Sequence, residues 1–174
     1  MRATVELVGQ TPYAELAVDA IARRAGTSKP AIYRRWPSKA HLVHEAVFPL
    51  DDATELPDTG TLTGDVREMV RRTVEVLTTP AAIAALPGLV AEMAADLTLH
   101  AALLERFSGI LSRGLTDRLE DAVARGEVRS DVTAADLTEA VAGITFLRLL
   151  TRGTTLDDAW IERTTTLITR GICT

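Results

Sequence analysis

The stretch from Val18 to Trp36, VDAIARRAGTSKPAIYRRW, constrains the fold of this 174-residue chain more than any other. It predicts two short helices joined by a tight turn. Ile21 and Ala22 supply the apolar face of the first helix. Gly26 is expected to end that helix, because glycine adopts a positive φ without steric cost. The stretch is therefore a candidate helix-turn-helix.

The second helix of this stretch opens with small polar residues and continues with cations. Thr27 and Ser28 are both possible N-caps. Pro30 is tolerated because the first turn has no intrahelical partner for its missing N–H. Ile32 is expected to point inward, and Trp36-Pro37 to end the helix. The residues left mostly outside are Lys29, Tyr33, Arg34 and Arg35. This composition suits insertion into a DNA major groove with phosphates on either side.

A longer segment, LAVDAIARRAGTSKPAIYRRWPSKAHLV, resembles the helix-turn-helix of the TetR (tetracycline-repressor-like) family of transcriptional regulators. The matching residues are Val18, Ile21, Ala22, Ala25, Gly26, Ser28, Lys29, Tyr33, Trp36, Ser38, Lys39 and Leu42. The resemblance implies an all-α fold. It would have an N-terminal three-helix helix-turn-helix DNA-binding domain followed by a larger helical ligand-binding and dimerisation domain.

The residues expected to contact DNA are Thr27, Ser28, Lys29, Tyr33, Arg34 and Lys39. Lys29 is the best candidate for a base edge, because lysine can donate to guanine O6 and N7. Thr27, Tyr33 and Lys39 are expected to contact phosphates, and Arg34 either a phosphate or a base edge. In related regulators a lysine at the position of Lys39 touches a phosphate. The alternative for Tyr33 and Trp36 is packing within the N-terminal DNA-binding domain, and we favour this alternative for Trp36.

The distribution of charge supports a nucleic-acid partner, although the net charge of the chain is −5. Residues 1–44 hold seven Lys or Arg against three Asp or Glu, whereas residues 45–174 hold twelve against twenty-one. A basic head on an acidic body suits a protein whose head meets phosphates. Small imbalances of this kind are also common, so the asymmetry alone does not decide the function.

Composition favours helices packed by small aliphatic side chains, because 47% of the residues are hydrophobic and only 4% aromatic. No apolar run reaches membrane-spanning length; Ala81 to Leu99 is interrupted by Pro87, Glu92 and Asp96. No signal segment opens the chain, and the single cysteine excludes an internal disulfide framework. We therefore expect a cytoplasmic protein with no membrane partner.

Two features of the first 48 residues depart from the family pattern. Residues 1–10 are expected to form only the remainder of a first helix, without a basic arm, which would reduce phosphate contacts. Ala17 stands where the family commonly has a threonine N-cap, so we expect a looser second helix. Asp19 can still favour that helix N-terminus through the dipole. Ser38 is expected to cap a connecting helix that runs to Val47 or Phe48.

Two domains joined by a linker are expected. Residues 1–48 would form the DNA-binding domain with its connecting helix, residues 49–61 an acidic, turn-rich linker, and residues 62–174 the effector-binding and dimerisation domain. The first body helix is expected from Thr63 to about Thr78, with an inner stripe of Val66, Val70, Thr73 and Leu77. The next begins at Thr79-Pro80, has a break or kink at Pro87-Gly88, and resumes with Leu89, Val90, Met93 and Leu97 inward. Further helices are expected from about Ala101 to Arg125, ended by Gly126, from Thr133 with Asp136 to about Arg152, and from Thr155 with Asp158 to the end.

The family's body holds a ligand pocket, and its last two helices form a four-helix bundle with a second subunit. Candidate pocket residues are Met69, Thr73, Leu86, Met93, Leu97, Phe107, Leu111 and Phe146. Candidate dimer-interface residues are Val141, Ile144, Thr145, Trp160, Thr164, Leu167 and Ile168. Flexible methionines and few polar groups would suit an apolar or amphipathic effector. For every one of these residues, packing within the subunit or exposure at the surface is the alternative.

Signals of catalysis are weak, and no cofactor is implied. There is no glycine-rich phosphate loop and no nucleophile elbow. His41, His44 and Glu45 could in principle bind a metal, but a packed or solvated helix face is the better interpretation. The sequence and the resemblance together predict a homodimeric repressor that binds a palindromic operator and is released by a small molecule. The alternatives are a helical dimer that binds a partner or lipid with DNA binding weakened or lost, and an all-helical enzyme.

Overall fold

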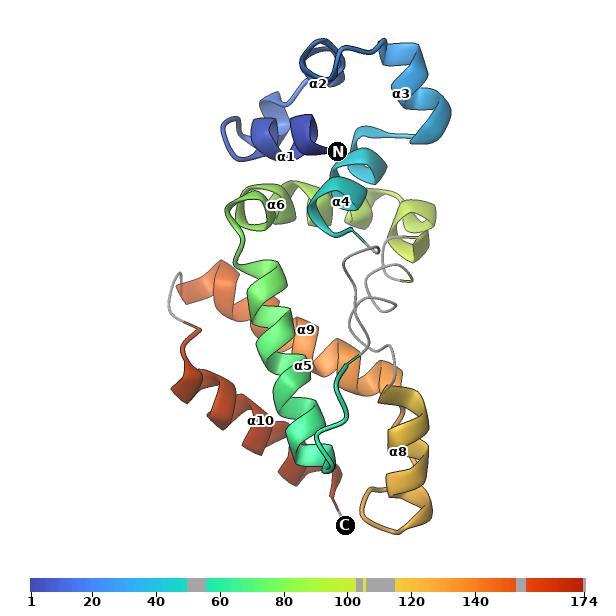
Figure 1. Cartoon of the computed structure of the whole chain (residues 1–174), viewed down its shortest axis with the longest axis vertical. Coiled ribbons are helices and arrows are strands. Elements are labelled where there is room, and N and C mark those ends of the chain that lie inside the picture. The colour runs from blue at the N-terminus through green and yellow to red at the C-terminus, as the bar shows by residue number, and fades with distance from the viewer. Residues whose placement is uncertain (50–55, 103–104, 106–114, 153–155, 174) are drawn as a thin grey trace. The chain divides into compact units, whose positions relative to one another are not determined.

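The computed structural model describes residues 1–49, 56–102, 105, 115–152 and 156–173 (Figure 1). Helices account for most of this part of the chain, and its only β-type pairing is an isolated bridge between Val128 and Cys173. The chain divides into two compact units. The head unit comprises Met1–Asp52 and Thr78–Phe107, and the body unit comprises Ala53–Leu77 and Ser108–Thr174.

The head unit consists of short helices that pack on one longer helix. These are α1 (Arg2–Val8), the 3-10 helix η1 (Tyr13–Glu15), α2 (Val18–Ala25), α3 (Lys29–Arg35), α4 (Lys39–Val47) and α6 (Pro80–Ala95). Both α1 and α4 pack on α6 (Figure 1). Helix α6, which was expected in the body, thus packs with the head.

The predicted helix-turn-helix is confirmed in its local details. Gly26 follows α2 with a φ of 66°, the left-handed conformation that glycine favours. The Ser28 hydroxyl caps α3 by accepting the Ala31 N–H at 3.3 Å. As expected from Ala17, the N-terminus of α2 has no side-chain cap. The Ser38 hydroxyl caps α4, also as predicted.

Helix α6 differs from the prediction. Of the break or kink expected at Pro87-Gly88, the break is wrong, because the helix is continuous from Pro80 to Ala95, and the kink stays a prediction. Its predicted start is confirmed, because the Thr79 hydroxyl accepts the Ala82 N–H. Of the side chains expected inside, Leu89 is buried, but Val90 is exposed and Leu97 is 78% exposed. The prediction thus holds for Leu89 and in part for Met93, which is half-buried, and it is wrong for Val90 and for Leu97, which lies beyond the end of α6.

The body unit is built around α5 (Leu62–Leu77), which packs against α8 (Leu115–Ala124), α9 (Ala134–Arg152) and α10 (Asp158–Ile172) (Figure 1). The predicted inner stripe of α5 is confirmed: Val66, Val70, Thr73 and Leu77 are all buried. The helix begins at Leu62, and Thr61 rather than Thr63 supplies the hydroxyl at its start, which accepts the Gly64 N–H.

The remaining body helices confirm some of the predicted helix starts and ends. Thr133 and Asp136 exchange hydrogen bonds at the start of α9, as the capping-box pattern predicted. Gly126 follows α8 with a φ of 73°. Asp157, not Asp158, caps α10, by accepting the Trp160 N–H. The linker residues 50–55, most of the predicted helix between 103 and 114, and Thr155 lie outside the described residues.

Candidate nucleic-acid interface

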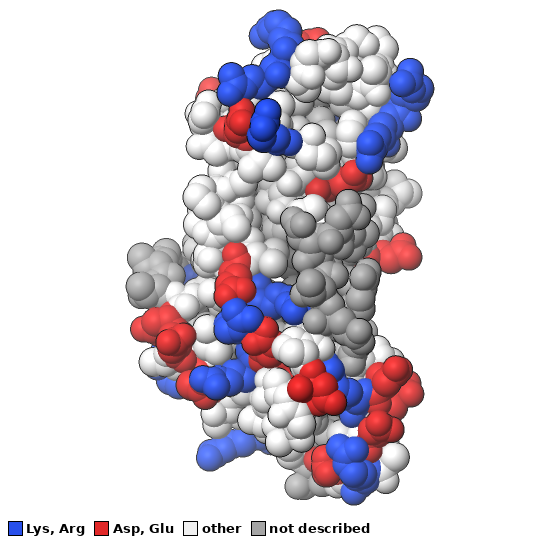
Figure 2. Space-filling view, viewed as in Figure 1, with Lys and Arg blue, Asp and Glu red and all other residues white. Residues whose placement is uncertain are grey.

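The helix-turn-helix presents one buried and one polar face. Ile21 and Ala22 of α2 and Ile32 of α3 are buried, as predicted, and hold the two helices together. The five side chains of the turn and α3 that were expected to contact DNA are exposed: Thr27, Ser28, Lys29, Tyr33 and Arg34. Figure 2 shows more Lys and Arg than Asp and Glu on the visible face of this region. The exposed face of α3 can therefore meet a polyanion.

The predicted base-reading lysine has a partner within the head. The Lys29 Nζ atom lies 2.8 Å from Asp19 Oδ2, and both side chains are exposed. The hydrogen bond to Asp19, with the attraction of its charge, raises the pKa of Lys29 above its usual value. Asp19 was expected only to favour the N-terminus of α2. Its position beside Lys29 depends on how α2 and α3 cross, which the sequence does not report.

Lys39 lies in a different environment from the one expected. Its Nζ atom donates to the backbone oxygen of Tyr13 at 3.0 Å and lies 4.1 Å from the centre of the Tyr13 ring. The same atom is 3.8 Å from Glu92 Oε1 on α6. Lys39 is therefore held inside the head unit. The phosphate contact expected of it requires the ammonium group to leave these acceptors.

Tyr13 is the centre of this cluster, which sequence reasoning missed. Its hydroxyl donates to Glu92 Oε1 at 2.9 Å, and its ring is buried. Burial, together with the Glu92 carboxylate, raises the pKa of Tyr13 well above its usual value. A Cβ atom on Gly88 would lie 2.0 Å from Tyr13 Cδ1, so only glycine fits at this position of α6. Glycine after proline in mid-helix was the available signal, and it was interpreted as a break.

Trp36 and the histidines have packing roles. Trp36 is half-buried, and the Arg35 guanidinium lies 4.8 Å from the centre of its ring. His41 Nδ1 is hydrogen-bonded to the Ser38 hydroxyl at 2.9 Å, and His44 is buried against Phe48. Among the described residues, no group of three or more His, Cys, Asp or Glu side chains is arranged to hold a metal ion.

The residues predicted to line an effector pocket are distributed over both units. Met69 and Thr73 are buried on α5, and Phe146 is half-buried on α9. Leu86 and Met93 are half-buried on α6 in the head unit. Phe107 and Leu111 lie outside the described residues. An apolar pocket formed by this set stays a prediction, and the exposed Leu97 does not contribute a buried wall to it.

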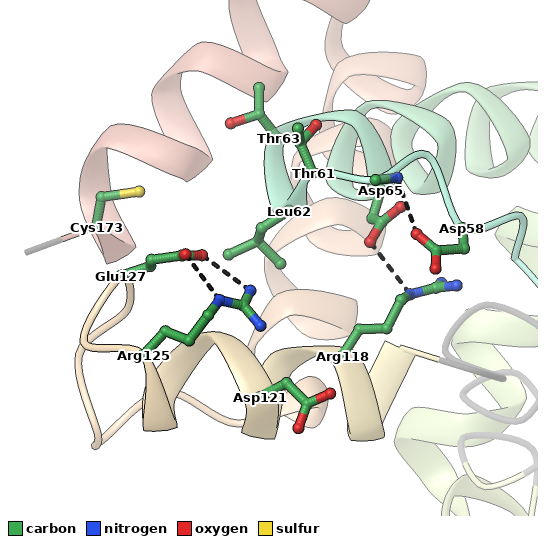
Figure 3. A pocket seen from close by; sticks show the side chains of 11 residues that line it. Asp58, Thr61, Leu62, Thr63, Asp65, Arg118, Asp121, Arg125, Glu127 and Cys173 are labelled. Atoms are coloured by element: carbon green, nitrogen blue, oxygen red, sulfur yellow. Dashed lines mark hydrogen bonds and ion pairs between the residues drawn. The ribbon is translucent and has the colours of Figure 1, made fainter.

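The body unit contains a polar hollow of about 510 Å³ between the start of α5, α8 and the end of α10. Arg118 projects into it from α8, and Arg125 from the turn that follows α8 (Figure 3). Arg118 Nε lies 3.1 Å from Asp65, and Arg125 Nε lies 2.8 Å from Glu127, whose pKa it lowers. Cys173 also lines this hollow and is exposed. Both arginines are already neutralised by carboxylates, so the hollow has no net attraction for anions.

Most side chains predicted for the dimer face are buried within the subunit. Val141, Thr145, Trp160, Thr164 and Ile168 are buried by the packing of α5, α9 and α10 within the subunit. The large apolar side chains that these two helices expose are instead Leu147 (60% exposed), Leu150 (52%) and Leu167 (66%). Of the predicted set, Leu167 is exposed and Ile144 is half-buried. That α9 and α10 form the dimer interface stays a prediction, and low charge alone did not distinguish their inner side chains from their outer ones.

No single helix in the described ranges is long and apolar enough to cross a membrane. Helices α5 and α6 meet the criteria of length and composition only when they are taken together as a broken pair.

Comparison with known sequences identifies both parts of the chain. Residues 1–46 match the family "Bacterial regulatory proteins, tetR family", and residues 56–168 match "Tetracyclin repressor-like, C-terminal domain". A Mycobacteroides abscessus protein named DNA-binding transcriptional repressor TetR is 35% identical over 157 residues, which cover 87% of this chain and 80% of that protein. The regulator YdeS of Bacillus subtilis is 25% identical over 166 residues, or 93% and 82% of the two chains.

Solved structures agree with these matches. The TetR-family regulator SCO0332 superposes with a TM-score of 0.68 at 28% identity, over 99% of this chain and 98% of that one. GusR of Salmonella enterica, at 19% identity, superposes with a TM-score of 0.67 over 97% and 91% of the two chains, which supports the fold. With a helix-turn-helix in the head and a matching C-terminal domain, the chain belongs to the TetR family of transcriptional regulators, which is not a family of enzymes.

Proposed function

We propose that this regulator is a homodimeric repressor that binds a palindromic operator through α3 and is released by a small molecule bound in its C-terminal domain. The observation that carries the proposal is the exposed, cationic face of α3 within a helix-turn-helix. Lys29 and Arg34 are candidates for base edges, and Thr27 and Tyr33 for phosphates. The similar protein of Mycobacteroides abscessus is named as a repressor.

The dimer would form through the exposed face of α9 and α10. Leu147, Leu150 and Leu167 are large apolar side chains on adjacent helices, and burying them between two subunits is favourable. Two-fold symmetry would place the two α3 helices about one DNA turn, ~34–36 Å, apart and make the operator palindromic.

Release would follow from a difference in affinity. The effector binds the subunit arrangement that cannot span the operator more tightly than it binds the DNA-binding arrangement. The ratio of these two affinities sets how far the effector can lower the affinity for DNA. The buried Met69 on α5 of the body unit suits an apolar or amphipathic effector. We retain residues 1–48 and 62–174 as the DNA-binding and effector domains, although α6 packs with the head.

The test of DNA binding is fluorescence anisotropy with a duplex taken from upstream of the protein's own coding sequence, at two salt concentrations. We expect tight, sequence-dependent binding that weakens steeply with salt, and a large loss in Lys29→Ala. Binding that is weak and indifferent to sequence would contradict the operator and favour a function of the body alone.

The test of the dimer is light scattering on Leu167→Glu. We expect this variant to be monomeric, because a charge would be buried in the interface. Leu97→Glu is the matched control, since Leu97 is also an exposed leucine but lies outside α9 and α10. A dimer that survives Leu167→Glu would exclude this face.

A further inference from the structure

The ion pair between Asp19 and Lys29 joins the two helices of the helix-turn-helix. Asp19 is the second residue of α2, and Lys29 is the first residue of α3. Their Oδ2 and Nζ atoms are 2.8 Å apart, and the two side chains are 56% and 46% exposed. In a helix-turn-helix, the first residues of the second helix contact base edges. Wherever Lys29 meets a base edge, the Asp19 carboxylate is therefore beside it.

Neither helix capping nor stability explains this carboxylate well. The N-terminus of α2 has no side-chain cap, and Asp19 Oδ2 is directed to Lys29 instead. An exposed ion pair contributes little to the free energy of unfolding. For DNA binding in general, a negative charge at this position is unfavourable, since it faces a polyanion. Besides its favourable position in the first turn of α2, a carboxylate beside Lys29 can discriminate between bases.

A donor beside an acceptor matches only some base pairs. Across the major groove, a G·C pair presents two acceptors, guanine N7 and O6, followed by one donor, cytosine N4. An A·T pair alternates acceptor, donor and acceptor. The Lys29 ammonium has three N–H donors, and the Asp19 carboxylate has about four acceptor sites, so each can keep the other as a partner and still contact a base.

We propose that Asp19 and Lys29 together read one G·C base pair in each half-site, an inference that rests on the proposed operator binding. Lys29 donates to guanine O6 and N7, and Asp19 accepts from cytosine N4. With an A·T pair at the same position, the central adenine N6 donor would face the ammonium group, which is also a donor and cannot accept from it. Asp19 is then a specificity-determining residue that lowers general affinity for DNA and raises discrimination.

The experiment is in vitro selection from a library of duplexes with randomised positions, using the full-length wild type, Asp19→Ala and Asp19→Asn. We expect the wild type to select a palindrome with a fixed G·C pair in each half-site. In Asp19→Ala, the preference at that pair falls about fivefold or more, while binding to a scrambled duplex becomes tighter. Asp19→Asn retains one acceptor oxygen and part of the preference.

The matched control is Glu6→Gln. It removes the carboxylate of another exposed ion pair in the head, the one with Arg24, without touching α3. It should change the affinity for all sequences alike and leave every base preference intact. If Asp19→Ala selects the same sequences with the same strength as the wild type, the inference is overturned while operator binding stands. If the wild type selects no sequence, both operator binding and the inference fail.

Discussion

Each unit of the protein contains a carboxylate that accepts a hydrogen bond from a hydroxyl group and lies beside a cation. The two carboxylates differ in how far their side chains are exposed to solvent. In the head, Glu92 accepts a hydrogen bond from the Tyr13 hydroxyl and lies near Lys39, and the Glu92 side chain is 38% exposed. In the body, Asp65 accepts the Thr59 hydroxyl at 2.9 Å and faces Arg118, and its side chain is 3% exposed.

This difference in exposure decides what each cluster can do. Water can replace a partner of Glu92, so the head cluster can exchange partners at small cost. Water cannot readily replace a partner of Asp65, so breaking that pair leaves a buried charge. The body cluster therefore fixes the segment before α5 to α5 and α8, which Arg118 reinforces by donating to the backbone oxygen of Leu56 at 3.0 Å.

The largest effect is expected from Arg118→Met, which leaves Asp65 buried without its cation. The free energy of unfolding should fall by about 3 kcal/mol, reduced somewhat because Thr59 still donates to Asp65. Urea unfolding measures the loss, and hydrogen exchange should locate it in α5 and α8. Arg125→Met, which breaks an exposed pair beside the same hollow, should leave stability unchanged. Equal losses in both variants would contradict the role given to burial.

Gly88→Ala should have the next largest effect, because its Cβ atom would overlap the Tyr13 ring. Displacing the ring should cost the head unit about 2 kcal/mol, measured by urea unfolding. A double-mutant cycle supplies the control, since without the ring the clash disappears. Gly88→Ala should therefore cost nothing further in a Tyr13→Ala background. A full additional loss there would mean that Tyr13 is not the residue that requires glycine.

Tyr13→Phe should cost about 1 kcal/mol by removing the hydrogen bond to Glu92. It should also change the pH dependence of unfolding. Since the pKa of Tyr13 is raised in the folded state, the unfolded chain loses this proton first, and stability falls as the pH rises above about 10. Urea unfolding on both sides of that pH should show this fall in the wild type and in Tyr33→Phe, but a smaller one in Tyr13→Phe.

The smallest effect on stability is expected from Lys39→Met, at no more than about 1 kcal/mol. Because its ammonium group already has acceptors in the head, we expect the salt dependence of DNA binding to stay unchanged. A decrease of about 0.9 in the slope of log K against log salt would show instead that Lys39 moves to a phosphate when DNA binds.

The parts of the fold that the sequence predicted well depend on near neighbours. Gly26, Ser28 and the Thr133–Asp136 pair act within one turn of their helices, so their chemistry can be read from spacing alone. The helix-turn-helix and the inner stripe of α5 follow from such local rules.

The errors concern contacts between residues far apart in the chain. Spacing alone makes Pro87-Gly88 resemble a break in α6, whereas in the structure Gly88 leaves room for the ring of Tyr13, 75 positions away in the chain. The same limitation affected the dimer face. Val141 and Leu147 both lie on an apolar stripe of α9, and only the packing of α5 shows which one is covered.

Cys173 has a practical consequence for measuring how the regulator works. It is the only cysteine in the chain, it is exposed, and its backbone pairs with Val128 at the end of α10. A spin label attached there needs no engineered mutation. In a symmetric dimer, two such labels would give a single intersubunit distance, which could be followed as DNA or a small molecule is added.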